Sequence, residues 1–225
     1  MIAQRLSPTS GLDPVVFIVD DDISVRESLE GLISFAGWRA EAFASAEEFL
    51  ARARADCPSC LILDVSLPEL NGLDLQQLLA SDRSEMPIIF VTGHGDIPMS
   101  VNAMKAGAVE FLTKPINDDA LLKAIEHAIE RSRSSLDDQA DIEQLRRRYG
   151  SLTPREQEVM GLVVSGLLNK QVGSVLDISE ITVKAHRGKM MQKMEADSLA
   201  DLVRMAVRLD VAPAQNPWQP VRHEL

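Results

Sequence analysis

Short apolar runs rich in β-branched residues alternate with amphipathic stretches through residues 15–131. The runs have the length and composition of β-strands, and the stretches between them repeat apolar residues at helical spacing. Two runs, Val15–Val19 and Ile88–Val91, are almost continuously apolar, which is typical of strands buried on both faces of a parallel sheet. Strands are expected at Val15–Val19, Trp38–Phe43, Cys60–Leu63, Ile88–Thr92 and Val109–Thr113, and helices near 24–36, 46–54, 71–80, 98–106 and 117–131. The pattern predicts an α/β fold, a (βα)5 doubly wound parallel sheet.

Residues 150–210 show helical periodicity only. Thr153 precedes Pro154 at the first helical position and Glu156 at the third, which together form a capping box. After this first helix, further helices are expected at 169–176, 180–194 and 198–209. The pattern predicts a small all-α four-helix domain whose second and third helices, joined by a tight turn, form a helix-turn-helix.

Polar segments separate and flank the two domains, which are placed at residues 14–131 and 150–210. Residues 132–149 keep a sparse apolar thread, so a partly helical linker continuous with the preceding helix is expected. A partly disordered hinge is the alternative on composition alone. Residues 1–13 are expected to be disordered, and residues 211–225, which are rich in proline, to form a flexible C-terminal tail.

Charge is distributed unevenly between the two predicted domains. The formal net charge is −11, and residues 1–149 account for all of it, with 14 Lys and Arg against 25 Asp and Glu. Residues 150–212 hold 8 of each, yet the helix at residues 180–194 is basic, with four Lys and Arg against one Glu. An acidic domain and a domain with a basic helix are expected to have different partners.

The remaining composition limits the class of protein. No apolar run approaches the ~18 residues that a membrane-spanning helix needs, and the N-terminus lacks the apolar core of a signal peptide. A cytoplasmic location without a membrane partner is therefore expected. Cys57 and Cys60 form a CxxC pair, but the second pair that a zinc site requires is missing. Ordinary reduced thiols are expected, and a redox role is the alternative.

Chemically distinctive residues follow four of the five expected strands. They are Asp20, Asp21 and Asp22 after the first strand, Asp64 after the third, Thr92 at the end of the fourth and Lys114 after the fifth. Because the carboxyl ends of parallel strands lie on one edge of the sheet, these side chains are expected in one crevice. An Asp after a strand is often only a turn residue or an N-cap, but complementary groups at four strand ends favour a site.

These residue types suit phosphoryl transfer. Clustered carboxylates repel each other unless a cation neutralises them, and oxygen ligands with room for water suit Mg²⁺. Asp64 is then a carboxylate nucleophile that can form an aspartyl phosphate. Thr92 can donate a hydrogen bond to one phosphoryl oxygen, and Lys114 supplies a point charge for another.

Four motifs make residues 14–131 resemble the response-regulator receiver domain of the two-component systems. The motifs are VDDD with Arg26 following, LILDVSLPELNGLDL, FVTGHGD and KAGAVEFLTKP. The resemblance implies that Asp64 accepts phosphate from a sensor histidine kinase. It also implies a Mg²⁺ site formed by Asp20, Asp21, Asp64 and the backbone carbonyl of Ser66.

The same resemblance assigns the phosphoryl-sensing residues. Thr92 and Phe111 are implied to act as the switch pair, and Lys114 to sense the phosphoryl group, with a cis peptide before Pro115. Asp22 is expected to be an additional, solvated acid. His94 is interpreted as a loop residue that modulates the lifetime of the phosphoryl group, because an ionised nucleophile needs no base.

The helix at residues 180–194 has an apolar face and an opposite face that suits DNA. The core face consists of Val183, Met190 and Met194. The opposite face consists of Ile181, Ala185, Gly188 and Gln192, flanked by Lys184 and Lys189. Small residues between lysines suit a helix that enters the major groove, and close approach to DNA explains Gly188, which costs ~1 kcal/mol in a helix interior. A solvated basic face on a helical bundle is the alternative.

Further polar residues are candidates for contacts to DNA phosphates. They are Asn169, Lys170, Thr182, Arg187 and Lys193. Around them, the segments LTPREQEVM, NKQVGSVLDISEITVKAHRGKMMQKM and SLADLVRMAV resemble the four-helix LuxR-type DNA-binding domain. The whole chain resembles the FixJ/NarL subfamily of transcriptional regulators. One departure is Gly173, where the family usually carries Ala, and it is expected to loosen the scaffold helix slightly.

The resemblance implies a transcriptional response regulator that Mg²⁺-dependent phosphorylation activates. Its implied partners are a sensor histidine kinase, double-stranded promoter DNA, RNA polymerase and, on phosphorylation, a second copy of the chain. The residues expected on the dimer surface are Leu199, Leu202, Val203 and Ala206. The chain is not expected to be an enzyme, beyond slow autodephosphorylation.

Three other functions are compatible with parts of the sequence. A haloacid-dehalogenase-like phosphatase also uses Asp, Thr, Lys and Mg²⁺, but it places its nucleophile in a DxD motif on the first strand. A receiver that never takes phosphate would be a constitutive binding module, which the intact acidic pair, Thr92 and Lys114 disfavour. A thiol sensor would act through Cys57 and Cys60.

Overall fold

The computed structural model describes residues 13–211, apart from residues 54, 69, 83–85 and 94–96. The chain divides into two compact units between Asp137 and Asp138. The termini that were expected to be disordered or flexible lie outside the described residues except for Asp13 and Val211, and His94 also lies outside them.

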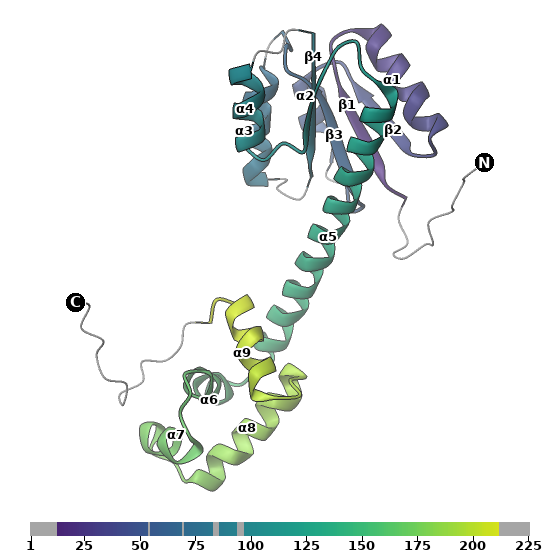
Figure 1. The fold of residues 1–225 in the computed structure, drawn as a ribbon. Helices are drawn as coiled ribbons and strands as arrows, with labels where there is room; N and C mark the ends of the chain where they lie inside the picture. The colour runs from purple at the N-terminus through teal and green to yellow at the C-terminus, as the bar shows by residue number, and fades with distance from the viewer. Residues whose placement is uncertain (1–12, 54, 69, 83–85, 94–96, 212–225) are drawn as a thin grey trace. The chain divides into compact units, whose positions relative to one another are not determined.

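Five parallel strands form the sheet of the first unit, in the order β2-β1-β3-β4-β5 (Figure 1). The strands are β1 (Val15–Val19), β2 (Arg39–Phe43), β3 (Ser59–Asp64), β4 (Ile88–Thr92) and β5 (Glu110–Thr113). The unbroken apolar runs of β1, β3 and β4 are buried along their whole length. Since the strand order reverses at β1, the carboxyl ends of β1 and β3 border the crevice in which such sheets bind ligands.

Helices cover both faces of this sheet. They are α1 (Ile23–Phe35), α2 (Ala46–Ala51), α3 (Gly72–Asp82), α4 (Ile97–Lys105) and α5 (Asp118–Gly150). Alternate residues of the strands point to opposite faces. Phe17 therefore packs in the core under α2, α3 and α4, whereas its neighbour Ile18 packs under α1 and α5. The predicted doubly wound α/β fold is confirmed.

Helix α5 is longer than the sequence predicts, because residues 132–149, expected as a partly helical linker, are all helical. Residues 118–137 of α5 belong to the first unit and residues 138–150 to the second. In the first unit, the buried hydroxyl of Ser132 accepts a hydrogen bond of 3.0 Å from the amide of Ser59 at the start of β3. The alternative of a partly disordered hinge over residues 132–149 does not agree with this continuous helix.

The second unit is all-helical after α5. Its helices are α6 (Pro154–Val164), α7 (Asn169–Leu176), α8 (Glu180–Met194) and α9 (Leu199–Arg208). The predicted capping box is present, since the amide of Thr153 donates to Glu156 at 2.9 Å and the amide of Glu156 donates to the Thr153 hydroxyl at 3.3 Å. Between α7 and α8 the chain turns at Asp177, which has a left-handed φ of 53°, and Ser179 caps α8. This is the predicted helix-turn-helix.

Candidate functional site

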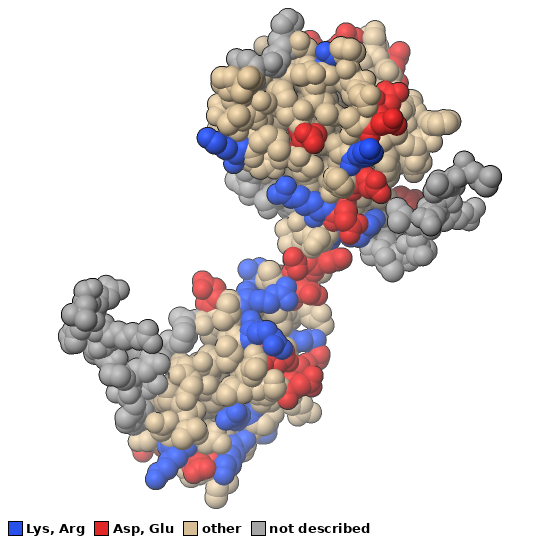
Figure 2. Space-filling view, viewed as in Figure 1, with Lys and Arg blue, Asp and Glu red and all other residues tan. Residues whose placement is uncertain are grey.

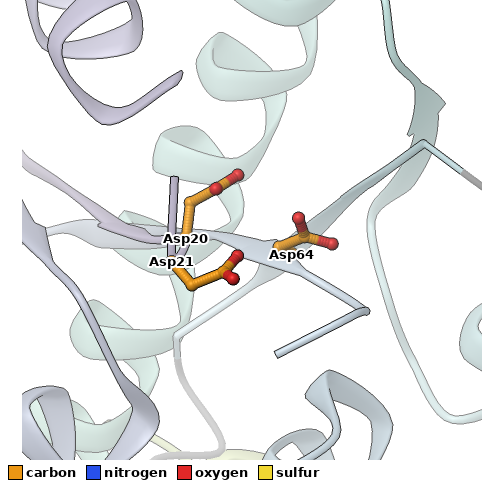
Figure 3. A group of neighbouring side chains, drawn as sticks. All are labelled: Asp20, Asp21 and Asp64. Carbon is orange, nitrogen blue, oxygen red and sulfur yellow. The ribbon is translucent and has the colours of Figure 1, made fainter. Parts of the chain in front are cut away.

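Three carboxylates lie together at the ends of β1 and β3 (Figure 3). Val19 and Leu63 pair in register, so the residues that follow them, Asp20 and Asp64, lie side by side. Asp20, Asp21 and Asp64 each offer a carboxylate oxygen within 4.8 Å of the others. Asp20 and Asp64 are buried, whereas Asp21 is exposed to water. An all-oxygen cluster with one open side suits Mg²⁺, which keeps several of its water ligands.

Lys114 reaches this cluster from the end of β5. Its Nζ lies 2.7 Å from Oδ2 of Asp20 and 2.7 Å from Oδ2 of Asp64. Burial raises the pKa of Asp20, and the hydrogen bond from Lys114 offsets only part of this rise. Burial alone lowers the pKa of Lys114, but its hydrogen bonds to the two carboxylates outweigh that effect and raise the pKa. Lys114 therefore holds a positive charge between two buried carboxylates.

Backbone amides fix the two buried carboxylates in place. Oδ1 of Asp64 accepts a hydrogen bond of 2.8 Å from the amide of Ser66, and Oδ1 of Asp20 accepts one of 3.0 Å from the amide of Asp22. The guanidinium of Arg26 donates to the backbone carbonyl of Asp20 at 2.6 Å. The implied role of the Ser66 carbonyl as a metal ligand stays a prediction. Asp22 is exposed, as expected, and its side chain caps α1 through the amide of Ser24.

The two residues of the implied switch pair project from the same face of the sheet. Thr92 is fully buried and pairs with Thr113. Phe111 lies two positions before Thr113, so its side chain points the same way as that of Thr92. Phe111 is half-buried, and its ring lies 6.2 Å from that of Phe90 between centroids. The peptide between Lys114 and Pro115 is cis, as expected.

Gly72, at the start of α3, positions the strand end that carries Asp64. A Cβ atom on Gly72 would lie 2.5 Å from the backbone oxygen of Asp64 and 3.0 Å from Cα of Val65. The amide of Gly72 donates to the carbonyl of Val65 at 3.1 Å, which holds the two segments at this separation. The sequence motifs assigned no role to Gly72, and its position eight residues after Asp64 was the available signal for a packing role.

The second unit carries a basic surface at the helix-turn-helix. Figure 2 shows Lys and Arg side chains gathered over α7 and α8 at one end of this unit, with an acidic side chain among them. Lys184, Ala185, Gly188 and Lys189 are all exposed, and Val183, Met190 and Met194 are buried, as the predicted faces require. Lys184 pairs with Glu180 at 2.9 Å across one helical turn. Because both side chains are largely exposed, this pair contributes little to stability and leaves Lys184 accessible.

The five candidate phosphate contacts have different surroundings. Lys170 is exposed, and Thr182 lies beside the N-cap, its hydroxyl 2.8 Å from that of Ser179. Arg187 donates to Oδ1 of Asn169 at 3.0 Å, which joins α8 to the start of α7 at the same surface.

Lys193 differs from the other candidates. Its Nζ lies 2.6 Å from Oε2 of the buried Glu156 and donates to the Ser151 carbonyl at 3.1 Å. The hydrogen bond from Lys193 holds the pKa of Glu156 below its usual value, with further lowering by the Thr153 amide. Lys193 is therefore a structural partner of Glu156 in this structure, and its expected contact to a DNA phosphate stays a prediction.

The expected dimer surface on α9 includes two residues that lie inside the second unit. Leu202 and Ala206 are buried in the core of this unit. Leu199 is exposed and Val203 half-buried. The resemblance named residues of α9 for the dimer surface without separating its exposed residues from those on the apolar face that packs inward.

The two cysteines are poorly suited to redox chemistry. Cys60 lies within β3 and is fully buried, and burial raises the pKa of its thiol far above the usual range. Burial also raises the pKa of Cys57, which is half-buried. A reactive cysteine needs an accessible thiolate, so a thiol sensor is not favoured.

Across the described parts of the chain, none of the helices combines the length and apolar character needed to cross a membrane.

Comparison with known proteins finds a family for each of the two units. Residues 16–126 match the family described as response regulator receiver domain, and residues 150–206 match the bacterial regulatory proteins of the luxR family. The chain is 52% identical over 198 residues to nodulation protein W of Bradyrhizobium diazoefficiens, which covers 88% of this chain and 87% of that protein. It is 42% identical over 202 residues to the transcriptional regulatory protein FixJ of Rhizobium meliloti, covering 90% of this chain and 99% of that protein.

Two solved response regulators resemble this chain over most of its length. The response regulator StyR is 45% identical, with a TM-score of 0.76, over 88% of this chain and 100% of that one. Full-length FixJ from B. japonicum is 38% identical, with a TM-score of 0.51, over 87% of this chain and 97% of that one.

These findings define a receiver domain joined to a LuxR-type DNA-binding domain. The chain belongs to the FixJ-like response regulators of two-component systems, which are transcription regulators.

Proposed function

We propose that Mg²⁺-dependent phosphorylation of Asp64 by a sensor histidine kinase switches this regulator to its DNA-binding form. The observation that carries the proposal is the meeting of Asp20, Asp21, Asp64 and Lys114 at one edge of the sheet. A carboxylate oxygen of Asp64 attacks the phosphorus of a phosphohistidine, the P–N bond breaks, and the imidazole leaves. A bound Mg²⁺ would supply positive charge against the phosphoryl oxygens.

The residues of this chain then have separate tasks. Asp20 and Asp21 would hold the cation with Asp64, and Lys114 exchanges its bond to Asp64 for one to a phosphoryl oxygen. Thr92 donates to another phosphoryl oxygen, and Phe111, on the same face of the sheet, packs further inward. The chain is a phosphate acceptor with slow autodephosphorylation, and we do not propose that it turns over a substrate as an enzyme does.

The output of the switch is a change in affinity for DNA. Phosphorylation favours a homodimer, so that two copies of α8 meet a two-fold promoter site, where the regulator works with RNA polymerase in the cytoplasm. Such a switch is a shift between two populations, and it requires that the partner surface binds one state more tightly. The groove face of α8, with Lys184 and Lys189 beside Ala185 and Gly188, supplies the DNA contact.

One paired experiment tests both halves of the proposal. Acetyl phosphate with Mg²⁺ should add about 80 Da, one phosphoryl group, to the wild-type chain and not to Asp64→Asn. The same treatment should tighten wild-type binding to a two-fold DNA site, and Lys184→Ala or Lys189→Ala should weaken that binding. Equal DNA affinity of wild type and Asp64→Asn under phosphorylating conditions would refute the coupling.

A further inference from the structure

Ile181 is a large apolar side chain that α8 exposes to solvent. It is 80% exposed, in the first turn of the helix. Within residues 180–194, all of which the structure describes, no other large apolar side chain is among the exposed ones. Its β-branched side chain has few rotamers, so its two methyl-bearing branches keep a fixed direction. A single exposed apolar residue is ordinary, so its position decides whether it has a function.

That position lies on the groove face of the helix. Ile181, Ala185 and Gly188 are four and three residues apart, so they share one side of α8. A Cβ atom on Gly188 would meet nothing within 4 Å, so the space in front of this face is open. Lys184 and Lys189 flank the face and are exposed. Ile181 therefore projects from an otherwise small and shallow face that lies between two cations.

This combination matches DNA better than it matches a protein. A stable protein interface buries ~800 Å² on each partner with an apolar centre, and α8 offers one exposed apolar side chain with cations on either side. In the major groove, phosphates lie on both sides of the base edges, which complements the flanking lysines. The apolar group at those edges is the 5-methyl of thymine, and the N-terminal residues of recognition helices contact base edges.

We infer that Ile181 reads the 5-methyl group of one thymine in each half of the DNA site. The inference rests on the proposed DNA-binding function and deepens it, because it assigns a specificity-determining residue. Lysine contacts to phosphates add affinity for any duplex, whereas a methyl contact discriminates between bases.

The test removes the methyl group from DNA and the side chain from the protein. The full-length chain, phosphorylated with acetyl phosphate and Mg²⁺, selects its preferred duplex from a random pool. Each thymine of one half-site is then replaced by uracil, which lacks only the 5-methyl. At one position, uracil should weaken wild-type binding about fourfold, which corresponds to ~0.8 kcal/mol for one buried methyl. The Ile181→Ala chain should bind the thymine duplex and the uracil duplex with equal affinity at that position. If the side chain and the 5-methyl group contact each other, removing either one abolishes the effect of removing the other.

Matched variants separate this inference from its foundation. Val175→Ala removes an exposed apolar side chain from α7 rather than from α8 and should keep the wild-type ratio between thymine and uracil. Lys184→Ala should weaken binding to both duplexes by the same factor. If Ile181→Ala keeps the full thymine preference, or if the selected half-site has no position where uracil weakens binding, the inference is wrong while DNA binding remains. If the wild-type chain binds no duplex, the proposed function is wrong and the inference with it.

Discussion

The Nζ atom of Lys114 lies 2.7 Å from Oδ2 of Asp64, although the two residues are 50 positions apart. The same amine lies 2.7 Å from Oδ2 of Asp20, so one positive charge is shared between two buried carboxylates and offsets only part of their negative charge. A divalent cation and a phosphoryl group are proposed to bind at this same place. On this proposal, Lys114 would compete with the metal for the carboxylates before phosphorylation and would contact the phosphoryl group afterwards.

Replacing Lys114 by methionine should separate these two effects. Lys114→Met removes a positive charge next to the proposed cation site, so Mg²⁺ should bind roughly tenfold more tightly. The yield of phosphorylated Asp64 from acetyl phosphate should fall, because one phosphoryl oxygen loses its partner. Calorimetric titration with Mg²⁺ and intact mass measure the two effects. Lys123→Met, at an exposed position of α5, is the control, and an unchanged Mg²⁺ affinity in Lys114→Met would contradict the competition.

Asp20→Asn should stabilise the Mg²⁺-free protein near neutral pH. Burial raises the pKa of Asp20 above its ordinary value of 3.8, so the folded state holds the proton more tightly than the unfolded state. The contribution of this carboxyl to stability is full below pH 3.8 and is lost as the pH rises through the folded pKa. Removing the charge should therefore raise the free energy of unfolding by ~1 kcal/mol at pH 7.

Urea unfolding of Asp20→Asn at pH 4 and pH 7, without and with Mg²⁺, measures this prediction. The increase in the free energy of unfolding of Asp20→Asn over wild type should be larger at pH 7 than at pH 4. With saturating Mg²⁺ the wild type should become the more stable protein, because the variant has lost a ligand for the ion. Asp22→Asn is the matched control, since Asn caps a helix as well as Asp does. A variant that is less stable than wild type at pH 7 without Mg²⁺ would contradict the argument.

The sequence predicted the sheet and the acidic cluster because both depend on local patterns with one geometric consequence. The apolar runs of β1 and β4 identified buried parallel strands, and a parallel sheet places all carboxyl ends on one edge. The closeness of Asp20, Asp64 and Lys114 follows from that rule without further information. The helix-turn-helix followed in the same way from two helical segments, residues 169–176 and 180–194, that only a tight turn can join.

Other expectations depend on neighbours in space. Lys193 has the charge of a phosphate contact, but in this structure it pairs with the buried Glu156 on α6. Leu202 and Ala206 were expected on a dimer surface from the resemblance to the LuxR-type domain, but both are buried in the core of the second unit. Helix α2 was expected to end near residue 54, but it ends at Ala51. The next residue, Arg52, is outside the helix and pairs with Glu41 at 2.7 Å. Periodicity identifies an apolar face and does not identify what covers it.

Gly72→Ala should impair phosphorylation without touching a chemical group. The added Cβ would lie 2.5 Å from the backbone oxygen of Asp64, so the end of β3 or the start of α3 must move. Overpacking of this kind costs ~1–3 kcal/mol, and a displaced nucleophile should slow phosphorylation by acetyl phosphate about tenfold. Gly31→Ala in α1, where a Cβ meets nothing within 4 Å, should keep the wild-type rate. Equal rates in both variants would show that Gly72 has no positioning role.

Lys193→Ala should destabilise the second unit, whereas Lys189→Ala should not. The carboxylate of Glu156 is buried and would lose its cationic partner, which should cost ~2 kcal/mol. This is less than for a fully buried pair, because the side chain of Lys193 is 36% exposed. Lys189 is exposed on the groove face, so its removal should lower DNA affinity and leave the unfolding midpoint unchanged.

The pH dependence of the Lys193→Ala effect gives a second measurement. The pKa of Glu156 is held below its ordinary value of 4.5, so its contribution to stability is present above pH 4.5 and is lost as the pH falls through the folded pKa. The difference in the free energy of unfolding between wild type and Lys193→Ala should therefore become smaller at acidic pH. A constant difference from pH 7 down to pH 3 would show that the loss comes from packing and not from the ion pair.

Two helical glycines should respond oppositely to the same substitution. Helix propensity alone predicts that Gly→Ala stabilises a helix interior by ~1 kcal/mol. At Gly188 a Cβ would meet nothing within 4 Å, so Gly188→Ala should gain that amount, while DNA affinity falls because the groove face becomes less shallow. At Gly173 a Cβ would lie 2.7 Å from the backbone oxygen of Ile178, so Gly173→Ala should gain nothing or lose stability.

Thermal unfolding of the two Gly→Ala variants, with DNA binding measured on the same samples, tests this prediction. The close approach at Gly173 holds the turn that leads into α8, and the Ile178 amide donates back to the Gly173 carbonyl at 3.0 Å. Gly173 therefore fits its turn, which opposes the expectation that it merely loosens α7. If Gly173→Ala were as stabilising as Gly188→Ala, the turn would adapt freely and the expectation from the sequence would be correct. If Gly188→Ala left DNA affinity unchanged, Gly188 would not lie against DNA.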